Sequence, residues 1–431
     1  MSSATRTGTR CLHYVGLAAA LFTAVLAAWP LLSVPGLVNT RAGGDSPFLL
    51  LRVYELATNL RAGVVPARWM PDAAYGLGYP FFNYYAALPY YLAAALSLAG
   101  AGVLWGVKLA QLVGFVAAAA AMYALAHELF GDRAAALLAA VAYTFAPFHM
   151  VNVYVRGDSL SEFYAFAFYP LILWAILRLR RAPTAGSVAI LGFSYASLMV
   201  THNISAFIFS PLAGTAVIVA GASAPRARLR VLVLGAGSLL LGAALSAWFW
   251  APALLERSAV SLTDMTTGYF NYAGHFRSAN LVQRALAFDY TIDPARSPFA
   301  LGGLQAGLAI AGLAGLAAAT LLRRRHPALL VALAALAAYA VWPITPSSAV
   351  VWAHVPLLPM VQFPWRFLSI ASLATALLPA AALSALGSAG SRAPAKPQPV
   401  RRGSTSLQAI EALLAVALST LIAWSALALL R

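Results

Sequence analysis

The stretch "AALPYYLAAALSLAGAGVL" (residues 86–104) decides how this chain is threaded through a membrane. It is apolar and close to the length of about 20 residues that a helix needs to cross a bilayer. However, Pro89 interrupts its start, and the turn-rich stretch "YGLGYPFFNYY" (75–85) precedes it. We therefore predict that 86–104 does not cross but forms a juxtamembrane or re-entrant segment.

Composition places the chain in a membrane. Of its 431 residues, 62% are hydrophobic and only 9% are charged, whereas a soluble domain carries about 25% charged residues. Apolar runs of about 20 residues recur along the whole chain, and the alternating pattern of an outer-membrane barrel is absent. The sequence predicts an all-α, polytopic bundle of transmembrane helices.

The net charge of +16 is distributed in short clusters between the apolar runs. Such clusters are typical of cytoplasmic loops, so the charge does not indicate a nucleic-acid partner. We assign the N-terminus and the basic loops 177–181, 225–230, 323–326 and 391–402 to the cytoplasm. The only cysteine, Cys11, excludes an intramolecular disulfide, and the first apolar run, which ends near Leu37, is interpreted as a retained signal anchor.

The count of crossings also indicates that 86–104 does not cross the membrane. From residue 163 onward the spans alternate without conflict, but the loop 177–181 is cytoplasmic only if one earlier run fails to cross. With 86–104 excluded we expect eleven crossings, at about 10–37, 105–127, 134–150, 163–178, 186–202, 204–222, 231–250, 300–322, 328–343, 366–387 and 407–430. The expected units are a transmembrane module (1–387), a basic cytoplasmic linker (388–406) and a C-terminal transmembrane helix (407–431).

This topology also sorts the acidic residues. Nine of the twelve fall on the outer side, and none lies in the middle of an expected span. Ionisable groups at mid-membrane mark ion and proton pathways, so their distribution argues against a coupled transporter and favours chemistry at the outer membrane–water boundary.

The first outer loop contains "GGDSP" (43–47). Ser46 and Pro47 are typical of a helix start, and the residues after them have helical spacing: Leu49, Val53, Leu56 and Leu60 on one face, with Arg52, Glu55 and Asn59 on the other. We expect an amphipathic helix in the interface plane, ended by Gly63. Asp45 is then either a functional carboxylate in a flexible pocket or simply a support for the helix N-terminus.

Three other outer segments carry polar residues. The second loop holds Arg156, Asp158 and Glu162, which suit a phosphate, a metal or a sugar hydroxyl, or else form a surface pair with a helix cap. The turn "VTHNISAF" (200–207) holds His202 and Asn203, where a capping asparagine is the alternative. The segment "MVQFPWRFLSIAS" (360–372) holds Trp365 and Arg366, where an interfacial anchor is the alternative.

Several of these motifs resemble one superfamily. The first-loop Asp45, the stretches "GLGYPFFNYYAALPYYL" (76–92) and "ELFGDRAAALLAAVAYTFAP" (128–147), and then "RGDSLSE" (156–162) are similar to the pattern of GT-C membrane glycosyltransferases. Together with "THN" (201–203) and "FPWRF" (363–367), their order resembles most closely the bacterial integral membrane proteins called 6-pyruvoyl-tetrahydropterin synthase-related. The resemblance covers about residues 10–370.

The resemblance implies a glycosyltransferase of the bacterial cytoplasmic membrane that uses a polyprenyl-phosphate sugar donor. Its acceptor would be a glycan, a lipid or a protein on the extracytoplasmic face, with membrane lipids as further partners. Asp45 and Glu162 are then the expected catalytic residues. The expected substrate-binding residues are Arg156, Asp158, His202, Asn203, Trp365 and Arg366. The resemblance implies no particular cofactor. A divalent metal remains an open alternative, and the lack of an Asp-x-Asp pair in the second loop argues against it.

The mechanism we expect is an inverting displacement, in which Asp45 takes the proton of an acceptor hydroxyl and Arg156 and Arg366 stabilise the leaving phosphate. Two other classes remain open: a flippase or transporter of lipid-linked glycans, and a non-catalytic subunit of a polysaccharide assembly complex. A transporter would need a polar path through the bilayer centre.

Overall fold

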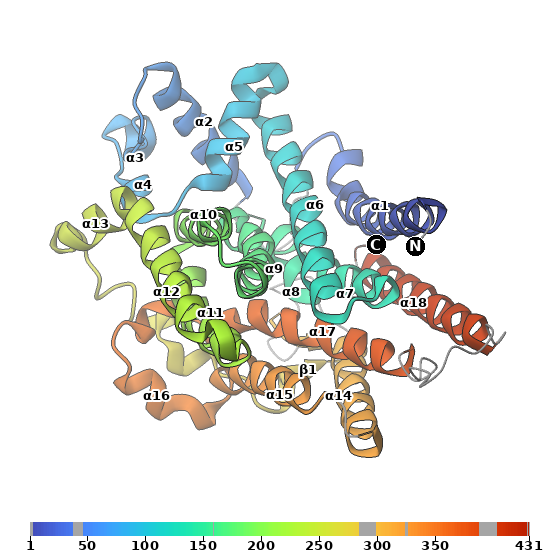
Figure 1. Cartoon of the computed structure of the whole chain (residues 1–431). Coiled ribbons are helices and arrows are strands. Elements are labelled where there is room, and N and C mark those ends of the chain that lie inside the picture. The colour runs from blue at the N-terminus through green and yellow to red at the C-terminus, as the bar shows by residue number, and fades with distance from the viewer. Residues whose placement is uncertain are drawn as a thin grey trace.

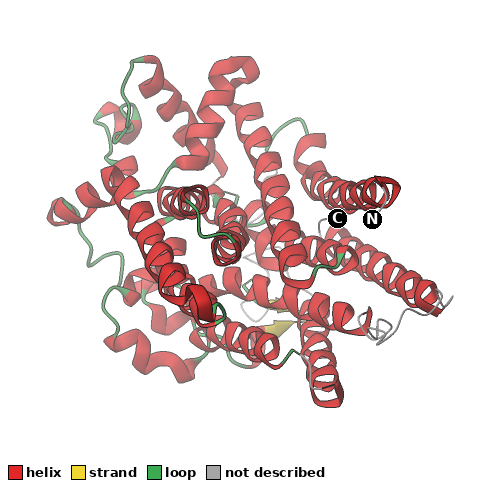
Figure 2. Cartoon of the chain, viewed as in Figure 1, coloured by secondary structure: helices red, strands yellow, loops and turns green. Residues whose placement is uncertain are grey.

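The computed structural model of the chain describes residues 3–37, 46–157, 159–283, 299–323, 326–387, 403–428 and 430. Helices make up nearly all of it, as Figures 1 and 2 show. The described strands are β1 (Val282–Gln283) and β2 (Leu301–Gly302), which pair in parallel. The predicted all-α class is therefore confirmed.

Ten described helical segments are long and apolar enough to cross a membrane, and α10 (Ala185–Thr201) is a shorter apolar helix of 17 residues. With α10 included, the number equals the eleven crossings predicted. The helices that form these segments are α1 (Ser3–Ser33), α6 (Gly102–Phe130), α7 (Arg133–Thr144), α8 (Pro147–Tyr154), α9 (Leu160–Arg181), α11 (Asn203–Ala222), α12 (Arg228–Leu245), α14 (Gly303–Arg323), α15 (Pro327–Val341), α17 (Leu368–Gly387) and α18 (Gly403–Ala428).

The stretch 86–104 folds back on the helix that follows it. Helix α5 (Leu88–Leu96) passes through a short π-helical turn (Ser97–Ala101) into α6, and Figure 1 shows α5 and α6 side by side, joined at the top of the view. Gly100 and Gly102 have φ of 107° and 73° at the break, values that favour glycine. A helix of this length rises only about 14 Å, less than half of a hydrocarbon core of about 30 Å. Helix α5 is therefore too short to cross by itself, and the statement that 86–104 does not cross stays a prediction.

A single glycine permits the close contact within this α5–α6 hairpin. A Cβ atom added at Gly106 would lie 2.5 Å from the carbonyl oxygen of Ala93. Small residues allow helix backbones to approach closely in membrane proteins. Any side chain at position 106 would push the two helices apart.

Helix α17 forms the centre of the bundle. It is buried along most of its length, with sixteen buried residues, and crosses the lower middle of Figure 1 above α14 and α15. Helix α18 packs on α7, so the predicted C-terminal helix is part of the same bundle. Most of the predicted linker 388–406 lies outside the described residues.

The first outer segment corrects one prediction. Helix α2 (Ser46–Arg61) buries Leu49, Val53 and Leu56 as expected, but its second face is not presented to water. Glu55 is 0% exposed and accepts a hydrogen bond from the Asp72 amide (3.1 Å). Asn59 is also buried, and its Nδ2 donates to the Trp69 carbonyl (2.9 Å). The expected interfacial helix is therefore covered on its polar face by the segment that follows it.

The segment after α2 and the segment after α12 are tied together. Short helices α3 (Ala73–Gly76) and α4 (Phe81–Tyr84) follow α2, and α13 (Ala247–Leu255) leads into the loop after α12. Asn83 donates to the Glu256 carboxylate (2.8 Å), and the Tyr84 hydroxyl donates to the Glu256 carbonyl (2.9 Å). The remaining elements are short helices: Pro225–Ala227, Arg257–Ala259, Gly268–Phe270, Tyr272–His275, Ala279–Leu281, Trp342–Ile344, Pro346–Ser348, α16 (Ala349–His354), Leu358–Val361 and Pro364–Phe367.

Candidate functional site

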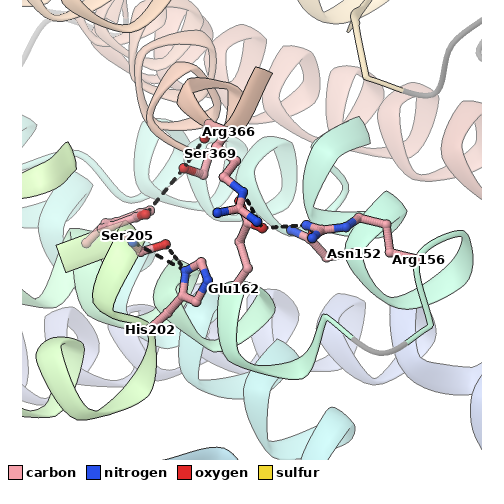
Figure 3. Close-up of polar contacts among 8 residues, drawn as sticks. Asn152, Arg156, Glu162, His202, Ser205, Arg366 and Ser369 are labelled. Atoms are coloured by element: carbon pink, nitrogen blue, oxygen red, sulfur yellow. Dashed lines mark hydrogen bonds and ion pairs between the residues drawn. The ribbon is translucent and has the colours of Figure 1, made fainter. Parts of the chain in front are cut away.

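Polar side chains from four separate segments meet at one place in the bundle (Figure 3). They come from α8 and the turn after it, from the first turn of α9, from the α10–α11 turn, and from the short helix before α17. We call this set the arginine cluster; its members are Asn152, Arg156, Glu162, His202 and Arg366. Segments more than 200 residues apart in the chain therefore build one site.

Glu162 lies at the centre of the arginine cluster. Its side chain is 1% exposed, and one carboxylate oxygen, Oε2, accepts a hydrogen bond from Nη1 of Arg156 in an ion pair. Nε of Arg366 lies 4.0 Å from the same oxygen. Within the described part of the chain, the other oxygen, Oε1, is buried without a hydrogen-bond partner. The carboxylate thus holds two guanidinium groups and keeps one acceptor position unused.

Arg156 is fixed from two sides. Its Nη1 also donates to Oδ1 of Asn152 (2.8 Å), one helical turn earlier. Its guanidinium carbon lies 5.2 Å from the ring centre of Trp365, within the range of a cation–π contact. With 14% of its side chain exposed, Arg156 is more accessible than Arg366 (9%) or Glu162.

The burial of Trp365 argues against the alternative that its segment is an interfacial anchor. It is only 4% exposed and stacks on Phe299, with ring centres 3.9 Å apart. Arg366 is also buried, and its guanidinium carbon lies 5.9 Å from the Trp365 ring. Trp365 therefore forms an apolar wall beside both arginines rather than a belt residue at the membrane surface.

His202 caps the helix that follows it. Its Nδ1 accepts a hydrogen bond from the Ser205 amide (3.3 Å) and lies 2.7 Å from the Ser205 hydroxyl. An accepting Nδ1 places the proton of a neutral imidazole on Nε2. Burial lowers the pKa of His202 to about 3, against the opposing influence of the Glu162 charge, so the ring is neutral at pH 7. Figure 3 shows this ring beside the Glu162 side chain.

The capping role that was the alternative for Asn203 is taken by His202 instead. Asn203 is exposed as the first residue of α11, and His202 rather than Asn203 provides the capping side chain. Asn203 therefore does not join the arginine cluster.

Of the predicted site residues, Arg156, Glu162, His202, Trp365 and Arg366 come together, whereas Asp45 and Asp158 lie outside the described residues. Asn152 was not among the predicted site residues, although it stands one helical turn before Arg156. Lys108, a lysine inside an apolar run, was not among them either. Within the described residues, no group of three or more His, Cys, Asp or Glu side chains is arranged to hold a metal ion.

The fold and this buried cluster define an integral membrane protein whose polar site is assembled from the ends of its helices. Residues 82–429 match the sequence pattern of the family described as 6-pyruvoyl-tetrahydropterin synthase related domain, membrane protein. The chain belongs to this family.

Other similarities are more distant. An uncharacterised protein of Lactococcus lactis subsp. cremoris (strain MG1363) is 22% identical over 259 residues, which cover 58% of this chain and 41% of that protein. Two structures of the Archaeoglobus fulgidus oligosaccharyltransferase are also similar. One, AglB in complex with an inhibitory peptide and a dolichol-phosphate, has a TM-score of 0.49 at 15% identity over 96% of this chain. The other, a complex with Zn and sulfate, has a TM-score of 0.48 at 16% identity over 95% of this chain. The chain spans 56% and 52% of their lengths.

Proposed function

We propose that this protein is a membrane glycosyltransferase. It transfers a sugar, with inversion, from a polyprenyl-phosphate donor to an acceptor hydroxyl on the extracytoplasmic face of the bacterial cytoplasmic membrane. The observation that carries the proposal is the pair of arginines, Arg156 and Arg366, held by one buried carboxylate. Both lie at helix ends that the charge pattern assigns to the outer side.

Arginine suits the leaving group of this reaction. A guanidinium is always charged and binds phosphate oxygens through two parallel hydrogen bonds. As the bond between the anomeric carbon and the phosphate oxygen breaks, negative charge grows on the phosphate, and fixed cations stabilise it most when water is excluded. Because Arg156 is the more exposed of the two arginines, the phosphate approaches from its side.

The geometry favours a different role for Glu162 from the catalytic one expected. A carboxylate paired with arginine is stabilised in its charged form, so it is a weak base. We assign Glu162 as the residue that positions Arg156 and Arg366. His202, neutral and protonated on Nε2, adds a hydrogen-bond donor beside this carboxylate.

Asp45 remains the proposed base, on the sequence argument alone. In the step proposed, its carboxylate accepts the acceptor hydroxyl proton, the hydroxyl oxygen forms a bond to the anomeric carbon, and the lipid phosphate departs with the electrons of the broken bond. A positioned base contributes about 10²–10⁴-fold in rate.

The test is transfer by the purified full chain in nanodiscs, with radiolabelled polyprenyl-phosphate sugars and glycan, lipid and peptide acceptors. We expect Asp45→Asn to lower transfer by about 10²–10⁴-fold without loss of folded protein, since asparagine is also a favourable residue near a helix start. Arg156→Ala should instead weaken use of the donor, because a charge-assisted contact is lost.

Near-wild-type transfer by Asp45→Asn would leave this residue as a helix support. If the wild-type protein moves lipid-linked glycan across the bilayer without transferring any sugar, the protein belongs to the transporter class instead.

A further inference from the structure

A further buried cation, Lys108, lies outside the arginine cluster. Lys108, in the second turn of α6, is 1% exposed. It is one of two lysines among the 28 basic residues of the chain. A lysine near a helix end in a membrane usually extends its ammonium group to water, and an enclosed one marks a functional site by default.

The Lys108 ammonium group is only partly satisfied. Nζ donates to the carbonyl oxygen of Val34 (2.5 Å), just after the end of α1, and lies 5.0 Å from the Trp105 ring centre. The part of the chain that the structure describes provides no carboxylate within ion-pair distance. Two of its three N–H donors are left for another partner, and burial of an ammonium without a counter-charge costs several kcal/mol.

Gln111 provides a second unused polar group beside it. It lies one helical turn further along α6, is 4% exposed, and its Oε1 is buried with no hydrogen-bond partner among the described residues. Since a carboxamide carries both an acceptor oxygen and a donor nitrogen, the same group can donate or accept. Lys108 and Gln111 line a cavity of about 10 Å³ together with Leu31, Leu49, Val153 and Gly157.

The cavity and the arginine cluster lie on two faces of one short segment. Asn152 and Arg156 are four residues apart and contribute to the arginine cluster. Val153 and Gly157, also four apart, line the cavity. The end of α8 therefore separates a compact ammonium group on one side from two guanidinium groups on the other.

We propose that Lys108 and Gln111 form a second anion subsite, which takes one oxygen of a phosphate monoester. The cavity has room for one group of the size of a water molecule, which fits a single phosphoryl oxygen but not a whole phosphate. A lysine ammonium is a compact point charge, unlike the broad guanidinium, so it suits this narrow place. That the monoester is the polyprenyl phosphate released from the donor, which is itself a phosphodiester, rests on the proposed function; the binding itself does not.

The test measures binding rather than transfer. The thermal unfolding of the full chain in detergent is followed while farnesyl phosphate is added, with farnesol as the uncharged control. Farnesyl phosphate should stabilise the wild-type protein more than farnesol does. Lys108→Met should weaken its apparent affinity about 10- to 100-fold, the range expected for a lost hydrogen bond to a charged group. Unchanged affinity in Lys108→Met would leave Lys108 as a cap of α1 and overturn the subsite.

A second variant keeps the test decisive if Lys108→Met does not fold. Gln111→Glu places a carboxylate beside the ammonium group, so it should raise the unfolding temperature without ligand and remove most of the response to farnesyl phosphate. An unchanged response would contradict the proposal.

Competition separates the possible sources of the phosphate. Inorganic phosphate should compete with farnesyl phosphate in the wild-type protein but not in Gln111→Glu. Equal competition by phosphatidylglycerol, a diester, would overturn the assignment to a monoester. A loss of affinity in Arg156→Ala with none in Lys108→Met would refute the second subsite and leave the proposed function standing.

Discussion

Glu55 on α2 and Glu162 on α9 are both buried, with 0% and 1% of their surfaces exposed, but their partners differ in kind. Glu55 accepts a hydrogen bond from the Asp72 amide and so ties the segment after α2 to that helix. Glu162 contacts guanidinium groups from two other segments. A buried backbone contact is sufficient to hold a loop, whereas a buried set of charges is costly and gives little net stability. This difference supports the proposal that Glu162 serves a site, whereas Glu55 serves the fold.

A matched pair of amide variants tests the difference between Glu162 and Glu55 most directly. We expect Glu162→Gln to lower sugar transfer by about 10²-fold or more, because misplacement of a catalytic group by 1 Å can have that effect. Glu55→Gln should stay within about threefold of the wild type, because its amide oxygen can still accept from Asp72. Transfer is measured on protein that elutes as a single folded species, and equal losses in both variants would remove the distinction.

A second test uses pH to ask whether burial keeps His202 neutral. The pKa of this residue is about 3 in the folded protein and about 6.5 in an unfolded chain. As pH falls below about 6.5, the unfolded chain gains a proton that the folded protein does not, so stability falls by up to about 1.4 kcal/mol per pH unit.

His202→Asn keeps an acceptor for the Ser205 amide and removes the titrating group. The unfolding temperature of this variant should therefore depend less on pH than that of the wild type between about pH 6.5 and 4. Parallel profiles would mean that His202 is protonated in the folded protein.

The third test has the smallest expected effect and concerns Glu55. The pKa of Glu55 is raised, whereas that of His202 is lowered. Burial raises the pKa of Glu55, the Asp72 amide opposes this, and the Asp72 charge adds to it. The folded protein therefore binds a proton more readily than the unfolded chain, and this group's contribution to stability is lost as pH rises above the unfolded value of about 4.3.

Glu55→Gln removes that loss, so its unfolding temperature relative to the wild type should increase from pH 4 to pH 7. The change should be worth less than about 1 kcal/mol, on the scale of one hydrogen bond. A difference that shrinks over this range would show that Glu55 is ionised readily in the folded protein.

The fold was predictable because apolar length and basic loops carry most of the information in a membrane helix. The parity of the crossings predicted that 86–104 does not span, and the structure adds that α5 is too short to span by itself. The buried polar face of α2 was not predictable, because helical spacing shows which residues share a face but not that residues such as Trp69 and Asp72 fold back over it.

The sequence predicted most residues of the candidate site, but it did not predict how these residues contact one another. Arg156, Glu162, His202 and Arg366 were predicted as site residues from separate segments, and the structure brings them together. Asp45, which was predicted to join them, lies outside the described residues. Their pairing depends on rotation about each helix axis, which sequence spacing alone does not fix. Lys108 was missed because a lysine near a helix end is ordinarily assumed to reach water, and only packing shows that it does not.

The close approach of Gly106 to the Ala93 carbonyl has a consequence for the insertion of the protein into the membrane. During insertion, the 43 residues from Leu88 to Phe130 offer enough apolar length for two passes. If both were taken, every later helix would enter with reversed polarity, and the arginine cluster would be delivered to the opposite compartment. We expect a close-packed helix pair that forms as one unit to prevent that second pass. On this expectation, the absence of a side chain at position 106 helps decide on which side of the bilayer the rest of the molecule presents its chemistry.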